Sequence, residues 1–408
     1  MLGFVYYRES THRGQLPNQF DEALKLATSA GAVIGQLTFG LLCDALGRKR
    51  MYGVSILIMI FATLATALSG EGPGLSVIGI IIFWRVILGL GLGGDYPMAA
   101  VITSEFASTR HRGRMMAAVF SMQGVNVPFP ALRLTLKLGL ITAALVFYFS
   151  LLSFRHSIIF EDSTIPFPTN PTDPSAGLPA VDRVWRLVVG FGCIPAVISL
   201  YYRLTIPETP RYTINIERDI VQGEDDVDGF LSLECPRGRD KSVPHPELEI
   251  TPRGSCRDFI KHFRQWQYGK VLLGTAGCWF FLDFAFYGLG LNSSVILQAI
   301  GFAGTGSVYD QLHSIAVGNI IIQFAGTLPG YWFSIAFIDV IGRKRLQLSS
   351  FAILTFLFAI IGFAYWPLYN QPNKGGFIAL FVLLQFFMNF GANTTTVCFP
   401  LNRSSHYL

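Results

Sequence analysis

Residues 44–50 read DALGRKR, and residues 339–345 read DVIGRKR. Each copy follows a long apolar stretch and precedes another. Gly-Arg-Lys-Arg alone could recur by chance, but the aspartate at the same offset in both copies favours a true internal repeat. A repeat in the same orientation is typical of a membrane protein with two parallel halves, which an axis along the membrane normal relates to each other.

The composition indicates an integral membrane protein. Of the 408 residues, 51% are hydrophobic and 14% are charged, whereas a soluble domain has about 25% charged residues. Nine apolar blocks are long enough to approach the roughly 20 residues that cross a bilayer. They lie at about 25–45, 52–70, 76–97, 115–149, 186–203, 270–300, 312–338, 348–368 and 376–400. Because lipid cannot hydrogen-bond the backbone and no barrel-type alternation is visible, we expect helices.

The basic residues predict the orientation. They cluster at residues 48–50, 110–114 and 343–345, after the first, third and seventh blocks. If each block crosses once, these clusters share one side, which the positive-inside rule assigns to the cytosol. That rule explains the net charge of +5 without nucleic acid as a partner. The polar segment 204–268 falls on the same side, and its content of Pro, Gly and charge predicts a largely disordered linker.

Three segments resemble the major facilitator superfamily: residues 40–50, residues 85–94 (RVILGLGLGG) and residues 207–212 (PETPRY). The resemblance implies an all-α, polytopic helical bundle with two pseudo-symmetric halves, of whose twelve helices about nine are expected here. Residues 1–203 would hold family helices 2–6, and residues 269–408 helices 7–10, so the chain is expected to be truncated at both ends. The implied motif residues at the cytosolic face are Asp44, Gly47, Arg48, Arg50, Glu105, Arg114, Glu208, Arg211, Asp339, Gly342 and Arg343.

A narrower resemblance is to the phosphate:proton symporter family of fungi and plants. It lies in GGDYP at 93–97, SE at 104–105, FSMQG at 120–124 and the residues Trp, Asp, Tyr, Gly and Asn at 279, 283, 287, 288 and 292. It implies import of inorganic phosphate with protons across the plasma membrane. The implied phosphate contacts are Tyr96, Gln123, Trp279, Asp283, Tyr287 and one of Asn389 and Asn393. The implied proton-coupling residues are Asp95, on the proton exit path, Asp283 and Arg85.

The position of Asp283 suggests how coupling would work. Asp283 is the only acidic residue between residues 270 and 300, with Trp279 one turn before it and Tyr287 one turn after it. Apolar surroundings favour the neutral form of a carboxyl group unless a cation is close. The neutral form can donate a hydrogen bond to phosphate, and the ionised form repels it. A helix-to-helix hydrogen bond without a role in transport is the alternative.

Arg85 lies near the middle of the third block. A charge there costs at least about 2.5 to 3.5 kcal/mol on insertion scales, so we expect it to face an internal cavity. Tyr96 is eleven positions later, about 20° away around a helix, so both point along one stripe with Gly89. Alternatively, Arg85 braces a neighbouring helix, and the glycines of 89–94 only allow close helix packing.

Several functional classes stay open. Import of an anion opposes about 2.3 kcal/mol per charge and 100 mV, which favours cotransport of protons. Alternatives are a transporter of a sugar or a glycerophosphodiester, and a truncated membrane protein that senses or inhibits without transporting.

An enzyme is not expected, because no nucleophile motif, metal cluster or Walker loop is visible. The six cysteines lack metal or disulfide spacing, so no metal and no cofactor are predicted. Two prolines and Arg133 interrupt the fourth block, which departs from the family pattern.

Overall fold

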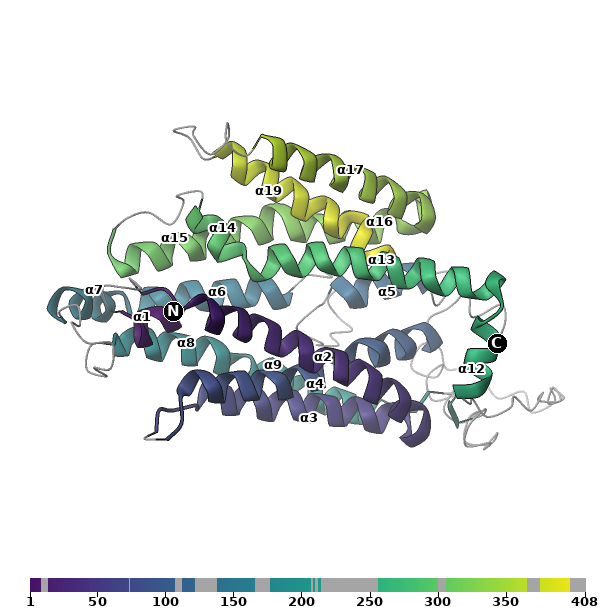
Figure 1. Cartoon of the computed structure of the whole chain (residues 1–408), viewed down its shortest axis with the longest axis horizontal. Coiled ribbons are helices and arrows are strands. Elements are labelled where there is room, and N and C mark those ends of the chain that lie inside the picture. Colours follow the sequence, from purple (N-terminus) through teal and green to yellow (C-terminus); the bar gives the residue numbers. More distant parts are fainter. Residues whose placement is uncertain are drawn as a thin grey trace, which may run out of the picture.

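The structure is a computed structural model, and in its described residues the regular elements are helices, apart from one isolated bridge between Gly72 and Leu75. It describes residues 1–8, 14–72, 74–106, 112–121, 138–165, 177–206, 208–209, 212–213, 256–299, 306–364 and 375–396. The helices run roughly parallel to the long axis and form two layers, the earlier part of the chain below and the later part above (Figure 1). The predicted all-α bundle is confirmed.

The N-terminal half is built around two closely packed helices. Its elements are α1 (Leu2–Tyr6), α2 (Asn18–Leu46), α3 (Arg48–Ala67), α4 (Val77–Phe106), α8 (Pro179–Phe191) and α9 (Cys193–Thr205). Gly31 and Gly35 of α2 face the backbone of α4, while Gly89 and Gly93 of α4 face the backbone of α2. A Cβ atom at any of the four would overlap a carbonyl oxygen of the other helix. The glycines therefore allow close helix packing, the alternative that the sequence left open.

The C-terminal half repeats this type of contact. Its elements are α12 (Cys256–Phe263), α13 (Trp266–Leu291), α14 (Ser293–Ala299), α15 (Val308–Ile321), η3 (Ile322–Thr327), α16 (Leu328–Ile341), α17 (Arg343–Phe363), α19 (Gly375–Phe387) and η4 (Met388–Ala392). Gly326 and Gly330 face the carbonyl oxygens of Val382 and Phe386. The π-helical segments η3 and η4 lie in the middle of the two spans that these glycines bring together. Such segments are frequent at functional sites.

Three further helices of the N-terminal half contact the C-terminal half: α5 (Arg112–Ser121), α6 (Leu138–Ser153) and α7 (Arg155–Thr164). The helix α5 packs on α16, and α6 packs on both α8 and α15. The predicted fourth block corresponds to α5 and α6, and residues 122–137 between them lie outside the described residues.

The predicted number of spans agrees with the structure. Eight described helices are long and apolar enough to cross a membrane, and a ninth candidate is the pair α6 and α7, which is bent by 60°. Within the predicted linker, the structure describes residues 204–206, 208–209, 212–213 and 256–268, which include α12, and the remainder lies outside the described residues.

At the end of the bundle opposite α12, an apolar core joins the two halves (Figure 1). Leu151, Val181 and Val184 from one half pack there with Leu312 and Ala316 from the other. Each of these side chains is almost completely buried. Burial of this kind stabilises by about 25 cal/mol per Å² of apolar surface, so the two halves are held together mainly by apolar contact at this end.

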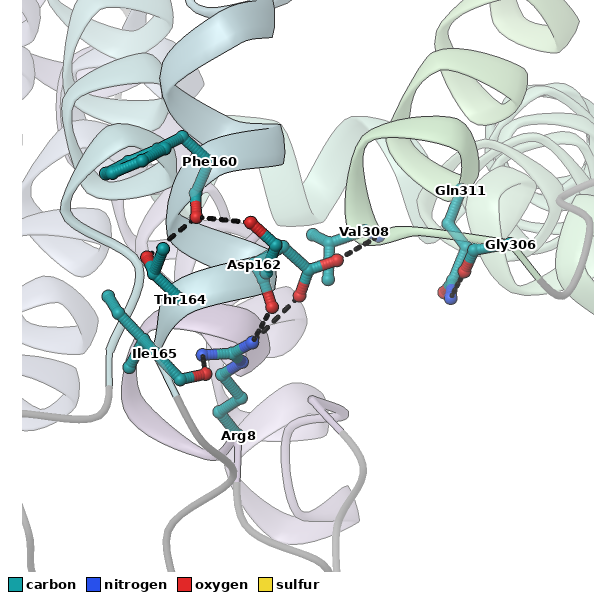
Figure 2. A network of polar contacts seen from close by, with 9 residues as sticks. Arg8, Phe160, Asp162, Thr164, Ile165, Gly306, Val308 and Gln311 are labelled. Carbon is teal, nitrogen blue, oxygen red and sulfur yellow. Dashed lines mark hydrogen bonds and ion pairs between the residues drawn. The ribbon is translucent and has the colours of Figure 1, made fainter.

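Beside this core, a polar contact connects three segments (Figure 2). Arg8 donates from Nη2 to Oδ1 of Asp162 at 2.8 Å, and the backbone N–H of Val308 donates to Oδ2 at 3.1 Å. Arg8 also donates to the carbonyl oxygen of Ile165 at 3.1 Å. Asp162 therefore links the start of the chain with the N-terminus of α15, where a carboxylate is favourable.

Candidate functional site

Three tyrosines from three different helices meet between the two halves. Tyr96 comes from α4, Tyr287 from α13 and Tyr331 from α16. The side chains of Tyr96 and Tyr287 lie next to each other, and Tyr331 lies close to both. Tyr331 is completely buried. A phenol hydroxyl can both donate and accept a hydrogen bond, so this cluster can present several donors to a bound molecule.

The face of α13 that carries Tyr287 also carries two other predicted residues. Trp279 packs against the apolar cluster around Met116 and Ile338, to which Tyr96 also belongs. Asp283 lies between Trp279 and Tyr287 and is half-buried. Among the described residues, its carboxyl group is partly shielded from water, and no lysine or arginine lies beside it. The structure therefore brings Trp279 and Tyr287 toward Tyr96, with Asp283 between them along α13.

An adjacent face of α13 anchors the helix. Leu282 is buried among Leu354 and Leu357 of α17 and Leu384 of α19. Phe280 and Phe284, by contrast, are 68% and 79% exposed, which places them on the outer surface of the bundle. Leu282 thus faces its own half, and Phe280 and Phe284 face outward. A single side of α13 is left to face the other half, and Asp283 lies near that side.

Asn389 and Asn393 lie at and just after η4, and both are buried. Asn393 donates from Nδ2 to the hydroxyl oxygen of Tyr331 at 2.5 Å and to Oδ1 of Asn389 at 3.4 Å. Asn389 donates to the carbonyl oxygen of Gln385 at 2.7 Å. Asn393 is thus the member of the pair whose amide reaches the tyrosine cluster. Gln123 lies outside the described residues.

Asp95 points away from the tyrosines, although it is the neighbour of Tyr96 in the chain. Its carboxylate pairs with Arg203 of α9, whose guanidinium lies 3.8 Å from the ring centroid of Tyr52. Arg203 also donates to the carbonyl oxygen of Tyr52 at 3.3 Å, and its side chain is 4% exposed. The pair links α3, α4 and α9 inside the N-terminal half.

Arg85 contacts a neighbouring helix. It donates from Nη1 to the carbonyl oxygen of Leu24 in α2 at 3.0 Å. The carboxylate of Asp21 lies near enough to attract its guanidinium electrostatically. This contact is the one expected if Arg85 braces a neighbouring helix, which was the alternative to its facing an internal cavity.

The first copy of the repeat forms a compact turn. Gly47, with φ of 96°, separates α2 from α3, and the backbone N–H of Lys49 donates to Oε2 of Glu208 at 3.1 Å. Arg48 forms an ion pair with Glu105 and donates to Thr209 at 3.2 Å. The structure thus brings together four of the predicted motif residues. Arg50 is exposed. The side chain of Asp44 and the whole of Arg211 lie outside the described residues.

The second copy has a different partner. Gly342, with φ of 89°, separates α16 from α17. Asp339 lies 3.3 Å from Nε of Arg114, which belongs to α5, and 4.0 Å from Nη2 of Arg343. Gly113 passes so close to Asp339 and Arg343 that a Cβ atom there would lie 2.5 Å from Oδ1 of Asp339. This motif therefore connects the two halves, whereas the first copy closes on its own half.

Comparison with known proteins defines the family. The sequence profile described as "Sugar (and other) transporter" matches residues 8–129 and 172–403. The chain belongs to this family. As a member of the sugar (and other) transporter family it is a multi-pass membrane protein, and the family consists of transporters rather than enzymes, as the sequence predicts.

Solved structures agree on the fold. A partially occluded inward-open xylose transporter XylE of E. coli is 17% identical, with a TM-score of 0.54 over 100% of this chain and 81% of that chain. The proton:xylose symporter XylE bound to 6-bromo-6-deoxy-D-glucose is 17% identical, with a TM-score of 0.56 over 98% and 74%. Both have the major facilitator fold, and the predicted fold class is confirmed.

Curated relatives are more similar in sequence. The repressible high-affinity phosphate permease of Neurospora crassa is 46% identical over 98% of this chain and 67% of its own length. The inorganic phosphate transporter PHO84 of Saccharomyces cerevisiae is 40% identical over 98% and 66%, and inorganic phosphate transporter 1-2 of rice is 36% identical over 98% and 72%. The chain thus spans about two thirds of the length of the two fungal relatives.

Sequence reasoning missed two residues of these clusters. Arg203 is a charge at the end of an apolar block, and that position could have signalled a buried partner for Asp95. Tyr331 gives no such signal, because residues 331–333 are all aromatic. Only the packing of α16 on η4 shows that Tyr331 is the one that contacts Asn393. Both residues became visible only through contacts between distant helices.

Proposed function

We propose that this chain is a proton-coupled importer of inorganic phosphate that works by alternating access in the plasma membrane. The names of the fungal and plant relatives support phosphate as the substrate. The observation that carries the proposal is the close approach of the Tyr96 and Tyr287 side chains, which brings donors from both halves to one place beside Asp283. A site shared by both halves can change its access when the halves rock.

The chemistry of the site suits an oxyanion. Tyrosine hydroxyls, an indole N–H and amide groups donate hydrogen bonds to phosphate oxygens without binding them as strongly as a cation would. The proposed contacts are Tyr96, Gln123, Trp279, Asp283, Tyr287, and Asn389 or Asn393. Phosphate can therefore bind and leave again during each cycle.

Asp283 couples the anion to the proton in this proposal. A neutral carboxyl group donates a hydrogen bond to phosphate, and loss of its proton turns it into a carboxylate that repels the anion. Because Arg203 holds Asp95 as an ion pair, Asp283 is the better candidate for the titrating group. One cotransported proton cancels the charge of dihydrogen phosphate, whose entry otherwise opposes about 2.3 kcal/mol per 100 mV.

The domain arrangement in this proposal follows the repeat. Residues 1–203 and 269–408 form the two halves that rock, and residues 204–268 connect them on the cytosolic side. Membrane lipid covers the exposed apolar faces, which include Leu37 of α2 and Phe284 of α13.

Uptake of radiolabelled phosphate in a host that lacks its own phosphate transporters tests the proposal. We expect uptake that is faster at pH 5 than at pH 7 and that a protonophore abolishes. Uptake of a sugar or a glycerophosphodiester but not of phosphate would identify another solute. A non-transporting role would be supported if the chain takes up none of these solutes but phosphate uptake appears once the sequence is extended to the length of the fungal relatives. Asp310→Asn, at an exposed position of α15, is a control for loss of an acidic residue.

A further inference from the structure

We propose that Tyr331 is a positioning residue of the substrate site, which fixes the amide of Asn393 next to the cluster of Tyr96 and Tyr287. This inference rests on the proposed function and deepens it. Tyr331 is completely buried, and Nδ2 of Asn393 lies 2.5 Å from its hydroxyl oxygen. It also lies close enough to Tyr96 and Tyr287 to influence both.

The amide of Asn393 differs from its polar neighbours in η4 and after it. Thr394, Thr395 and Thr396 donate their hydroxyls to backbone carbonyl oxygens of their own helix, at 2.8, 2.6 and 2.6 Å. These hydroxyls therefore satisfy local backbone groups. Asn393 instead donates across to α16, which is a bond that helix geometry does not require. A contact of this kind is the usual way in which a neighbouring residue orients a functional side chain.

Orientation matters because an asparagine amide has two unlike ends. The NH₂ group donates to an anion, whereas the carbonyl oxygen repels it. The hydroxyl oxygen of Tyr331 accepts from Nδ2, so it favours the orientation in which the NH₂ group points toward the tyrosine cluster. Replacement of this tyrosine by phenylalanine removes the acceptor and lets the amide turn.

The contact between Tyr331 and Asn393 belongs entirely to the C-terminal half. Gly330, the residue before Tyr331, approaches so closely that a Cβ atom there would lie 3.2 Å from Cβ of Asn389. This close packing fixes α16 to η4, so the two residues keep their contact while the halves rock. Tyr96 belongs to the other half. Tyr331 therefore contributes equally to binding in both states of the transport cycle.

A contribution that is equal in both states predicts a specific kinetic pattern. Loss of uniform binding raises KM and leaves the maximal rate unchanged. For Tyr331→Phe we expect KM for phosphate to rise about five- to tenfold, the effect of about one hydrogen bond. The maximal rate should change by less than about twofold. A structural defect would instead lower the amount of protein and the maximal rate.

The experiment is phosphate uptake over a range of concentrations for the unmodified chain, Tyr331→Phe, Asn393→Ala and the double variant. Rates are divided by the amount of protein in the membrane. Tyr309→Phe removes another buried tyrosine hydroxyl, in the apolar core between the halves, and is the matched control with an expected KM change below twofold. If Tyr331 acts through Asn393, the change from Tyr331→Phe should shrink to below twofold in the Asn393→Ala background.

The possible results separate the two proposals. No phosphate uptake by the unmodified chain would overturn the proposed function, and this inference with it. Phosphate uptake by the unmodified chain with an unchanged KM in Tyr331→Phe would overturn the inference alone. Effects of Tyr331→Phe and Asn393→Ala that simply multiply, or a KM change equal to that of Tyr309→Phe, would also overturn it.

Discussion

The side chains of Tyr96 and Tyr287 meet across the boundary between the two halves. Tyr96 lies on α4, which is packed against α2 through glycines. Tyr287 lies on α13, which is anchored to α17 and α19 through Leu282. Each tyrosine is therefore fixed to its own half. Any rocking of the halves must therefore change the distance between the two side chains, and an anion can bind between them.

Removal of either hydroxyl should weaken phosphate binding. We expect Tyr96→Phe and Tyr287→Phe each to raise the Kd by at least about tenfold, because a hydrogen bond to a charged group contributes about 1.5 to 3 kcal/mol. The double variant should lose less than the product of the two effects, since the hydroxyls interact with each other. Titration calorimetry measures these constants. Tyr201→Phe, on the exposed face of α9, should bind like the unmodified chain.

Asp283→Asn should separate binding from coupling. The asparagine amide keeps a hydrogen-bond donor, so phosphate should still bind, but the group can no longer release a proton. We expect counterflow exchange of phosphate to persist while uphill uptake and its dependence on pH are lost. Uptake that keeps its acceleration at low pH in this variant would remove Asp283 from the coupling mechanism.

The pair of Asp95 and Arg203 gives a test of what Asp95 does. Arg203→Gln leaves a buried carboxylate without its partner and should destabilise the protein by about 3 to 5 kcal/mol. The double variant Asp95→Asn, Arg203→Gln should recover most of this loss, as measured by thermal unfolding in detergent. Normal pH-dependent uptake by the double variant would show that Asp95 has a structural role only. A stable double variant whose uptake no longer depends on pH would place Asp95 on the proton path.

Gly89 is expected to be intolerant of any side chain. A Cβ atom there would overlap the carbonyl oxygen of Thr28, and the backbone of α2 cannot move aside as a side chain could. Overpacking usually costs about 1 to 3 kcal/mol, and a clash between backbones lies at or above that range. Gly277→Ala is the matched control, because no atom lies within 4 Å of its Cβ position. A thermal midpoint for Gly89→Ala equal to that of Gly277→Ala would contradict the helix contact described here.

The fold was largely predictable because the membrane restricts it to helices. Apolar blocks and basic clusters are local features, and they predicted the spans and the place of both repeats. The fourth block was harder, since the structure describes it as two helices, α5 and α6, with residues 122–137 between them outside the described residues. The sequence also gave no sign that the second copy of the repeat pairs with Arg114 of the other half.

The site was predictable only where its residues share one helix. Trp279, Asp283 and Tyr287 recur every four residues, so their common face follows from helix geometry. The neighbours Asp95 and Tyr96 point to different helices, and their roles therefore depend on what packs around α4. Arg203 and Tyr331 come from distant helices, and no periodicity connects them with their partners. Such pairings are decided by tertiary packing, which a single sequence does not encode locally.

Equilibrium binding of radiolabelled phosphate to the purified chain tests the shared site most directly, because it requires no movement across a membrane. We predict saturable binding that competes with arsenate, that xylose does not displace, and that is lost in the Tyr96→Phe, Tyr287→Phe double variant while Tyr201→Phe retains it. Absence of saturable binding in the folded, unmodified chain, or equal binding by the double variant, would contradict a phosphate site between Tyr96 and Tyr287.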